Sequence, residues 1–151
     1  PAAAKTIFDQ HPQVRGIKYT GTDLFSLRQY LQDIPQAKLF IGCDKLILSA
    51  LGEGAVGAVS GPCTIVPGLF ASLFSAFRGG HMEEASKIQS KVFATWQAFE
   101  KLPPIPSLKR VLQQRGVIDH PISRGPLRAL TSGEEVTLNQ LMEELDPSAS
   151  Y

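Results

Sequence analysis

The sequence has few cysteines, almost no net charge and no long apolar run. Its 151 residues include two cysteines, Cys43 and Cys63, too few for a disulfide framework or a four-cysteine metal site. Fifteen basic and fourteen acidic residues leave a formal charge of +1, and the basic residues are scattered singly. We therefore expect neither nucleic acid nor an anionic membrane surface as a partner. The most apolar stretch, 65–77, contains Pro67 and Gly68 and is too short to span a bilayer.

The start of the chain carries neither an initiator methionine nor a secretory leader. Its first residues, PAAAKTIF, are typical of a helix interior, which favours a chain cut from a longer one. With no leader and few cysteines, we expect a cytoplasmic protein.

The apolar content of 43% is that of a folded domain with a core, and its pattern alternates between strand and helix. Short β-branched or apolar runs precede segments with helical spacing, three times in succession. The expected strands are 14–20, 38–43 and 55–60, and the expected helices are 24–33, 46–51 and 65–77, the first capped by Thr22 or Asp23. This alternation predicts an α/β fold with a parallel sheet.

After Gly80 the pattern predicts helices only, at 83–102, 108–114 and 136–145. No low-complexity linker separates the two regions, so we expect one domain. Three parallel strands alone would leave two unpaired edges, so we expect further strands elsewhere.

Two sets of residues have ordinary structural explanations. The segment 52–57 matches the G-x-G-x-x-G dinucleotide motif, but its glycines follow a helix and precede a strand, the reverse of the required order. We interpret them as a helix cap and a site of close packing. The histidines His11, His81 and His120 are far apart and lie beside turn residues, so we expect surface turns rather than a metal site.

Polar residues follow the expected strands at their carboxyl ends, where α/β proteins build their sites. Lys18 lies late in the first strand, Asp44 follows the second and Ser60 ends the third. Taken alone, each has a second interpretation: a lysine that reaches solvent, a helix-capping aspartate and a strand-end turn serine.

The motifs GIKYTGTDL (16–24), IGCD (41–44) and GAVGAVS (54–60) occur in this order and spacing. Together with the segment 71–85, they resemble the dihydrodipicolinate synthase and N-acetylneuraminate lyase superfamily of pyruvate-dependent class I aldolases. Within it, Thr20 and Asp23 are more similar to the lyase branch. The resemblance implies the C-terminal half of a TIM barrel. Residues 1–80 would supply strands six to eight, and residues 81–151 a helical extension of the same domain.

The resemblance also implies a chemistry and an assembly. Lys18 would form a Schiff base with pyruvate or another 2-keto acid, which requires burial that makes a neutral amine accessible. Thr20 would line the pocket beside it, Gly42 and Asp44 would meet distal hydroxyls of the substrate, and Ser60 would also bind substrate. No metal or other cofactor is needed. The family's carboxylate-binding loop and catalytic tyrosine would lie upstream, and members are usually homotetramers.

Two positions depart from the lyase pattern where the substrate tail would bind. Lys45 replaces an expected glutamate, and Gly61 followed by Pro62 replaces an expected serine. An ammonium in place of a carboxylate favours an acidic tail over a glycerol one.

Two other interpretations remain open. The chain could be a catalytically incomplete half-barrel that acts as an associating module through its open strand edges. It could also be a small doubly wound domain of the flavodoxin type, for which residues 20–22 are a weak anion-binding loop.

Overall fold

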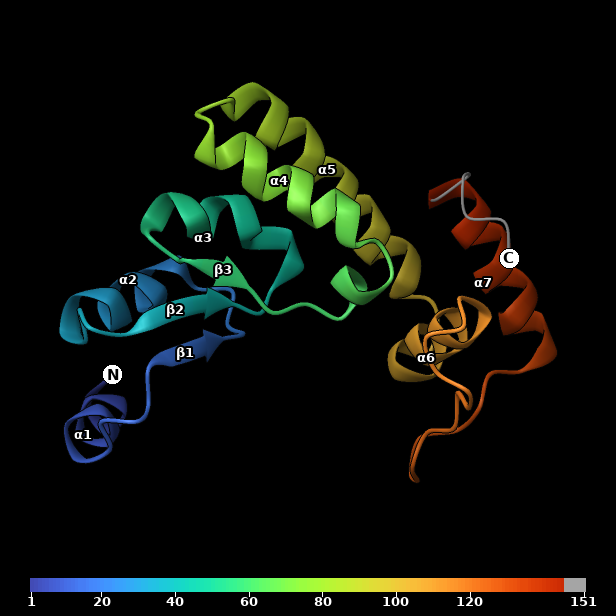
Figure 1. Cartoon of the computed structure of the whole chain (residues 1–151), viewed down its shortest axis with the longest axis horizontal. Helices are drawn as coiled ribbons and strands as arrows, with labels where there is room; N and C mark the ends of the chain where they lie inside the picture. The colour runs from blue at the N-terminus through green and yellow to red at the C-terminus, as the bar shows by residue number, and fades with distance from the viewer. Residues whose placement is uncertain (146–151) are drawn as a thin grey trace.

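The computed structural model describes residues 1–145, in which three strands alternate with helices and a helical region follows (Figure 1). The elements in order are α1 (Ala2–Gln10), β1 (Gly16–Tyr19), α2 (Leu24–Asp33), β2 (Lys38–Ile41), η1 (Asp44–Leu46, a 3₁₀ turn), α3 (Ile47–Glu53), β3 (Gly57–Ala58), η2 (Pro62–Thr64, also 3₁₀), α4 (Pro67–Arg78), α5 (Met82–Phe99), α6 (Pro104–Gln114) and α7 (Ser132–Leu145). The predicted α/β class is confirmed, and each predicted helix is present.

The strands form a parallel sheet in the order β1-β2-β3. Lys18 pairs with Phe40 and Phe40 with Gly57, and the strands lie in chain order, each joined to the next by a crossover that contains a helix, α2 or α3. All three are shorter than predicted, and β3 pairs with β2 at two residues only, Gly57 and Ala58. The further strands that we expected do not occur among residues 1–145, so β1 and β3 are the edges of the described sheet.

The two faces of the sheet differ in side-chain character. Leu39 and Ile41 are 1% and 0% exposed and face the helical layer, where the core continues through Leu27, Ile47 and Leu73. On the opposite face Lys18 is exposed and Phe40 is partly buried. A Cβ at Gly57 would lie 2.9 Å from the Phe40 ring, so this face needs a glycine beside that side chain.

Local chemistry explains the helix boundaries. The Asp23 carboxylate caps α2 by accepting hydrogen bonds from the N–H groups of Phe25 (3.0 Å) and Ser26 (3.1 Å). Gly54 ends α3 with a φ of 110°, a conformation that favours glycine. The glycine motif 52–57 therefore leaves a helix and enters a strand, which confirms its interpretation as a cap and a packing site.

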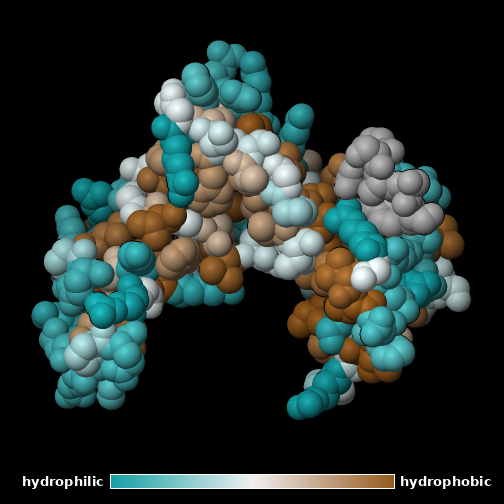
Figure 2. All heavy atoms as spheres, in the orientation of Figure 1, coloured by the Kyte–Doolittle hydropathy of each residue, from teal (hydrophilic) through white to brown (hydrophobic). Residues whose placement is uncertain are grey.

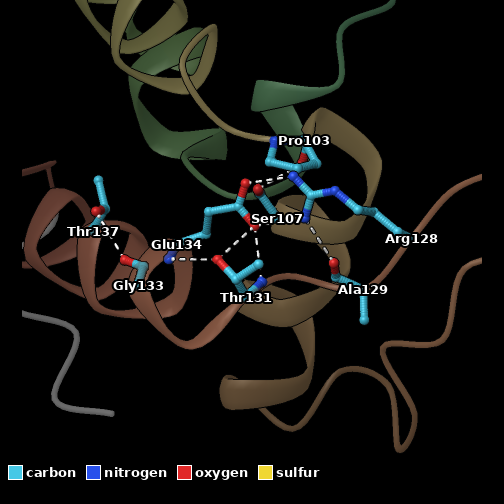
Figure 3. A network of polar contacts seen from close by, with 8 residues as sticks. All are labelled: Pro103, Ser107, Arg128, Ala129, Thr131, Gly133, Glu134 and Thr137. Atoms are coloured by element: carbon cyan, nitrogen blue, oxygen red, sulfur yellow. Dashed lines mark hydrogen bonds and ion pairs between the residues drawn. The ribbon is translucent and has the colours of Figure 1, made fainter.

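The helical region begins with α5, which forms a hairpin with α4 and packs closely along it (Figure 1). At the start of α7, Thr131 and Glu134 form a reciprocal capping box, and Arg128 binds the same carboxylate through two contacts of 2.7 Å (Figure 3). The Arg128 contact, followed by the Thr131 N–H, lowers the pKa of Glu134 to about 2. This network fixes the direction in which the chain enters α7.

In the space-filling view, the molecule is arched around a broad hollow between the sheet end and the α6 end (Figure 2). Apolar residues gather over the α6 region on the side of this hollow. No helix within residues 1–145 is long and apolar enough to cross a membrane.

Candidate active site

The predicted site residues gather where the three strands end. Lys18 is near the end of β1 and Thr20 follows it; Gly42 follows β2 and Ser60 follows β3. The ladder continues past the strand ends, since the Gly42 N–H donates to the Tyr19 carbonyl (2.7 Å) and the Val59 N–H donates to the Ile41 carbonyl (2.9 Å). These bonds align the carboxyl ends of the three strands, so the predicted site residues lie together at that end of the sheet.

The Lys18 and Thr20 side chains lie over Gly42. A Cβ at this position would lie 2.7 Å from Lys18 Cε and 2.8 Å from Thr20 Oγ1, closer than carbon and oxygen can approach. Because Gly42 has no side chain, the Lys18 and Thr20 side chains can occupy the space above it. Lys18 and Thr20 are both exposed, so the described residues leave the lysine open to solvent and do not supply the burial that its predicted chemistry requires.

Asp44 is the buried acid of the cluster, with 9% of its surface exposed. Burial raises the pKa of its carboxyl above the ordinary value, and the Ser60 hydroxyl and the charge of Lys18 partly offset this effect. Within the described chain, Asp44 Oδ1 has no hydrogen-bond partner. The alternative that Asp44 caps a helix is wrong: Cys43 precedes η1 and Leu46 precedes α3, and neither helix start has a side-chain cap.

Ser60 has a local structural role. Its Oγ accepts a hydrogen bond from the Cys63 N–H (3.3 Å) and so supports the η2 turn. Cys63 itself lies near the cluster, since burial, followed by the charge of Asp44, raises the pKa of its thiol. Ser60 is thus held between this turn and the Asp44 carboxyl.

Gln89 of α5 holds the Asp44 turn in place, and the sequence did not point to it. Its Nε2 donates to the Asp44 carbonyl (2.9 Å), and its Oε1 accepts from the Leu48 N–H (2.9 Å). The amide thereby supplies a hydrogen bond to the Asp44 carbonyl in η1. It also supplies a partner for the Leu48 N–H, which lies in the first turn of α3 and has no intrahelical acceptor. Nothing in the sequence could have indicated this contact, because it joins positions more than 40 residues apart.

Lys45 and Trp96 meet beside Asp44. Lys45 Nζ lies 3.4 Å from the centroid of the Trp96 ring, which also stacks on Phe93 at 6.0 Å. A pocket of about 430 Å³ opens here between the strand-end residues Asp44, Gly61 and Pro62 and side chains of α5 and α6. The sequence did not predict this pocket, since its two sides are distant along the chain.

The histidines lie away from this cluster. His11 follows α1, His81 precedes α5, and all three histidines are exposed, which confirms the prediction of surface positions. Among residues 1–145, no three His, Cys, Asp or Glu side chains are grouped closely enough to hold a metal ion.

Comparison with known proteins identifies the family. The family model described as dihydrodipicolinate synthetase family matches residues 2–145. The chain belongs to this family. An N-acetylneuraminate lyase of Rhizobium meliloti is 31% identical over 141 residues, which are 93% of this chain and 46% of that protein. The chain thus spans about half the length of the curated relatives it matches.

Solved structures of the family share the fold. The dihydrodipicolinate synthase of Bacillus anthracis is 25% identical with a TM-score of 0.77, and the match covers 91% of this chain and 46% of that one. An N-acetylneuraminate lyase of Fusobacterium nucleatum, solved with pyruvate, has a TM-score of 0.84 at 20% identity, covering 96% of this chain and 49% of that one. The described three-stranded unit and its helices thus correspond to about half of each of these structures.

Proposed function

We propose that this chain carries the nucleophile of a Schiff-base aldolase or lyase that makes or breaks a carbon–carbon bond between pyruvate and an aldehyde. The observation that carries the proposal is the position of Lys18 beside Gly42 at the carboxyl edge of the sheet, with Thr20 against the same glycine. The proposal is supported by the family, whose relatives are named as lyases and synthases.

Each residue of the cluster has a role in this chemistry. The neutral Lys18 Nζ attacks the keto carbon of pyruvate, and the resulting carbinolamine takes up a proton from solvent and loses water to give an iminium. Loss of a C3 proton then gives an enamine, whose C3 attacks the aldehyde carbon while the aldehyde oxygen takes up a proton. Thr20 lines the pocket beside Lys18. Gly42, Asp44 and Ser60 face the second substrate, the aldehyde. Hydrolysis of the product iminium returns the lysine.

The strands β1, β2 and β3 correspond in this proposal to strands six, seven and eight of a TIM barrel, and the assembly is a homotetramer. The groups that bury Lys18 and bind the pyruvate carboxylate come from outside the described residues, since Lys18 is exposed among them. The helices after Gly80 belong to the same domain.

The test is borohydride trapping in the full-length protein as its natural source produces it. Incubation with pyruvate, reduction and peptide mapping should place a stable adduct on Lys18. Lys38 is the matched control, because it is exposed, lies on the same face of the sheet and belongs to the neighbouring strand. Lys18→Arg should abolish the adduct and Lys38→Arg should preserve it. An intact protein that forms no adduct on Lys18 would refute the proposal.

A second function has its own observation, the exposed edges β1 and β3 of the described sheet. In that case the chain acts as an associating module without catalysis. Failure to form the pyruvate adduct on Lys18, together with tight association through these edges, would favour this second function.

A further inference from the structure

The pocket beside Asp44 has one wall that is almost wholly apolar. This wall consists of side chains of α5 and α6, namely Trp96, Phe99, Pro104, Ile105 and Leu108, with Glu100 as its one charged member. The opposite wall is formed by Asp44, Gly61 and Pro62. Asp44 comes two residues after Gly42, where a Cβ would lie 2.7 Å from Lys18 Cε, so the pocket begins beside the lysine cluster.

The apolar wall is already formed in the structure without a ligand. Trp96 is held by Phe93 on α5 and by the Lys45 ammonium, 3.4 Å from the ring centroid. Pro103 and Pro104 begin α6 and restrict its backbone, and Phe99 is 5% exposed. A preformed apolar surface binds without a large ordering cost.

A polyhydroxylated ligand would lack partners on this wall. A hydroxyl group buried without a hydrogen bond loses its bonds to water and gains none in return, which disfavours binding. An alkyl or aryl group instead gains free energy by covering apolar surface, and Ile105 offers such surface because it is 48% exposed. The Lys45 ammonium lies over the Trp96 ring, and the two charged residues that line the pocket, Asp44 and Glu100, are both acids, which does not favour an acidic tail.

We propose that this pocket receives the tail of the aldehyde and that the tail is an uncharged alkyl or aryl group. The inference rests on the proposed function, because it assigns the second substrate of the Lys18 site. It replaces the acidic tail that Lys45 suggested in the sequence.

Trp96 reports directly on this pocket, because it is the sole tryptophan of the chain. Titration with 1-hexanol, an unreactive probe, should change its emission saturably, whereas erythritol should not. Ile105→Asp should weaken hexanol binding about 10-fold, or about 1.4 kcal/mol. Ile122→Asp is the matched control: Ile122 is 74% exposed and lies outside the pocket, so this variant should bind hexanol as the unchanged chain does.

Turnover separates this inference from the proposed function. With pyruvate as donor, the kcat/KM of the full-length natural protein for hexanal should be at least about 10-fold higher than that for erythrose or 4-oxobutanoate. Ile105→Asp should raise the KM for hexanal and not that for pyruvate. A preference for erythrose or 4-oxobutanoate, or no saturable emission change with hexanol, would overturn the apolar pocket while the Lys18 adduct still forms. Absence of the adduct would overturn both proposals.

Discussion

At the scale of single residues, the space at Gly42 decides where Lys18 lies. In Gly42→Ala the new methyl would overlap Lys18 Cε at 2.7 Å, so the lysine must move. A misplacement of about 1 Å can cost about 100-fold in rate. We expect the rate of pyruvate adduct formation to fall at least about 10-fold, measured by borohydride trapping over time.

Gly52→Ala is the control for this substitution. Gly52 lies in α3, and a Cβ there would meet nothing within 4 Å. Alanine should therefore stabilise the helix by about 0.5 to 1 kcal/mol and leave the adduct rate unchanged. An equal adduct rate in Gly42→Ala and the unchanged protein would show that Lys18 has room to move without loss of reactivity.

Sequence reasoning could place Lys18, Asp44 and Ser60 because the carboxyl ends of parallel strands meet at one edge. The family resemblance points to Gly42 and Thr20, but only the structure shows that the Lys18 and Thr20 side chains both lie against Gly42. The burial of Asp44 could not be predicted in the same way, since it results from η1, α5 and the turn after β3 packing together. A local pattern favoured a helix cap for that residue, and tertiary packing overrode it.

At the scale of elements, Gln89 joins α5 to the turn that carries Asp44. Gln89→Ala removes both hydrogen bonds and leaves the Asp44 carbonyl and the Leu48 N–H without them. Because these groups are partly buried, we expect a loss of about 1 to 3 kcal/mol in the free energy of unfolding, measured by urea denaturation.

Gln97→Ala on the same helix is the matched control, since Gln97 is exposed. It should change the free energy of unfolding by less than about 0.5 kcal/mol. If the two variants were equally stable, the Gln89 bonds would contribute nothing beyond those that water supplies. The period of apolar residues predicts α5 itself, but a polar contact between distant elements has no period and no sequence pattern.

At the scale of the whole molecule, the sheet of the described residues ends at two open edges. β1 and β3 each have one neighbour, and Val56 and Val59 beside β3 are each 46% exposed. The alternation of strands and helices predicted three parallel strands, but it could not say what pairs with their outer edges. That information belongs to residues far away in sequence or to another chain.

Open edges beside exposed valines promote association between chains. We expect the 151-residue chain, studied alone, to sediment as a species heavier than 16.4 kDa that dissociates on dilution. Val59→Lys should shift it toward the monomer, because a charge beside an edge strand opposes pairing. Val136→Lys, at a 57% exposed position on α7, should not. A monomer at every concentration, or equal effects of the two lysines, would show that the edges of β1 and β3 are not the associating surface.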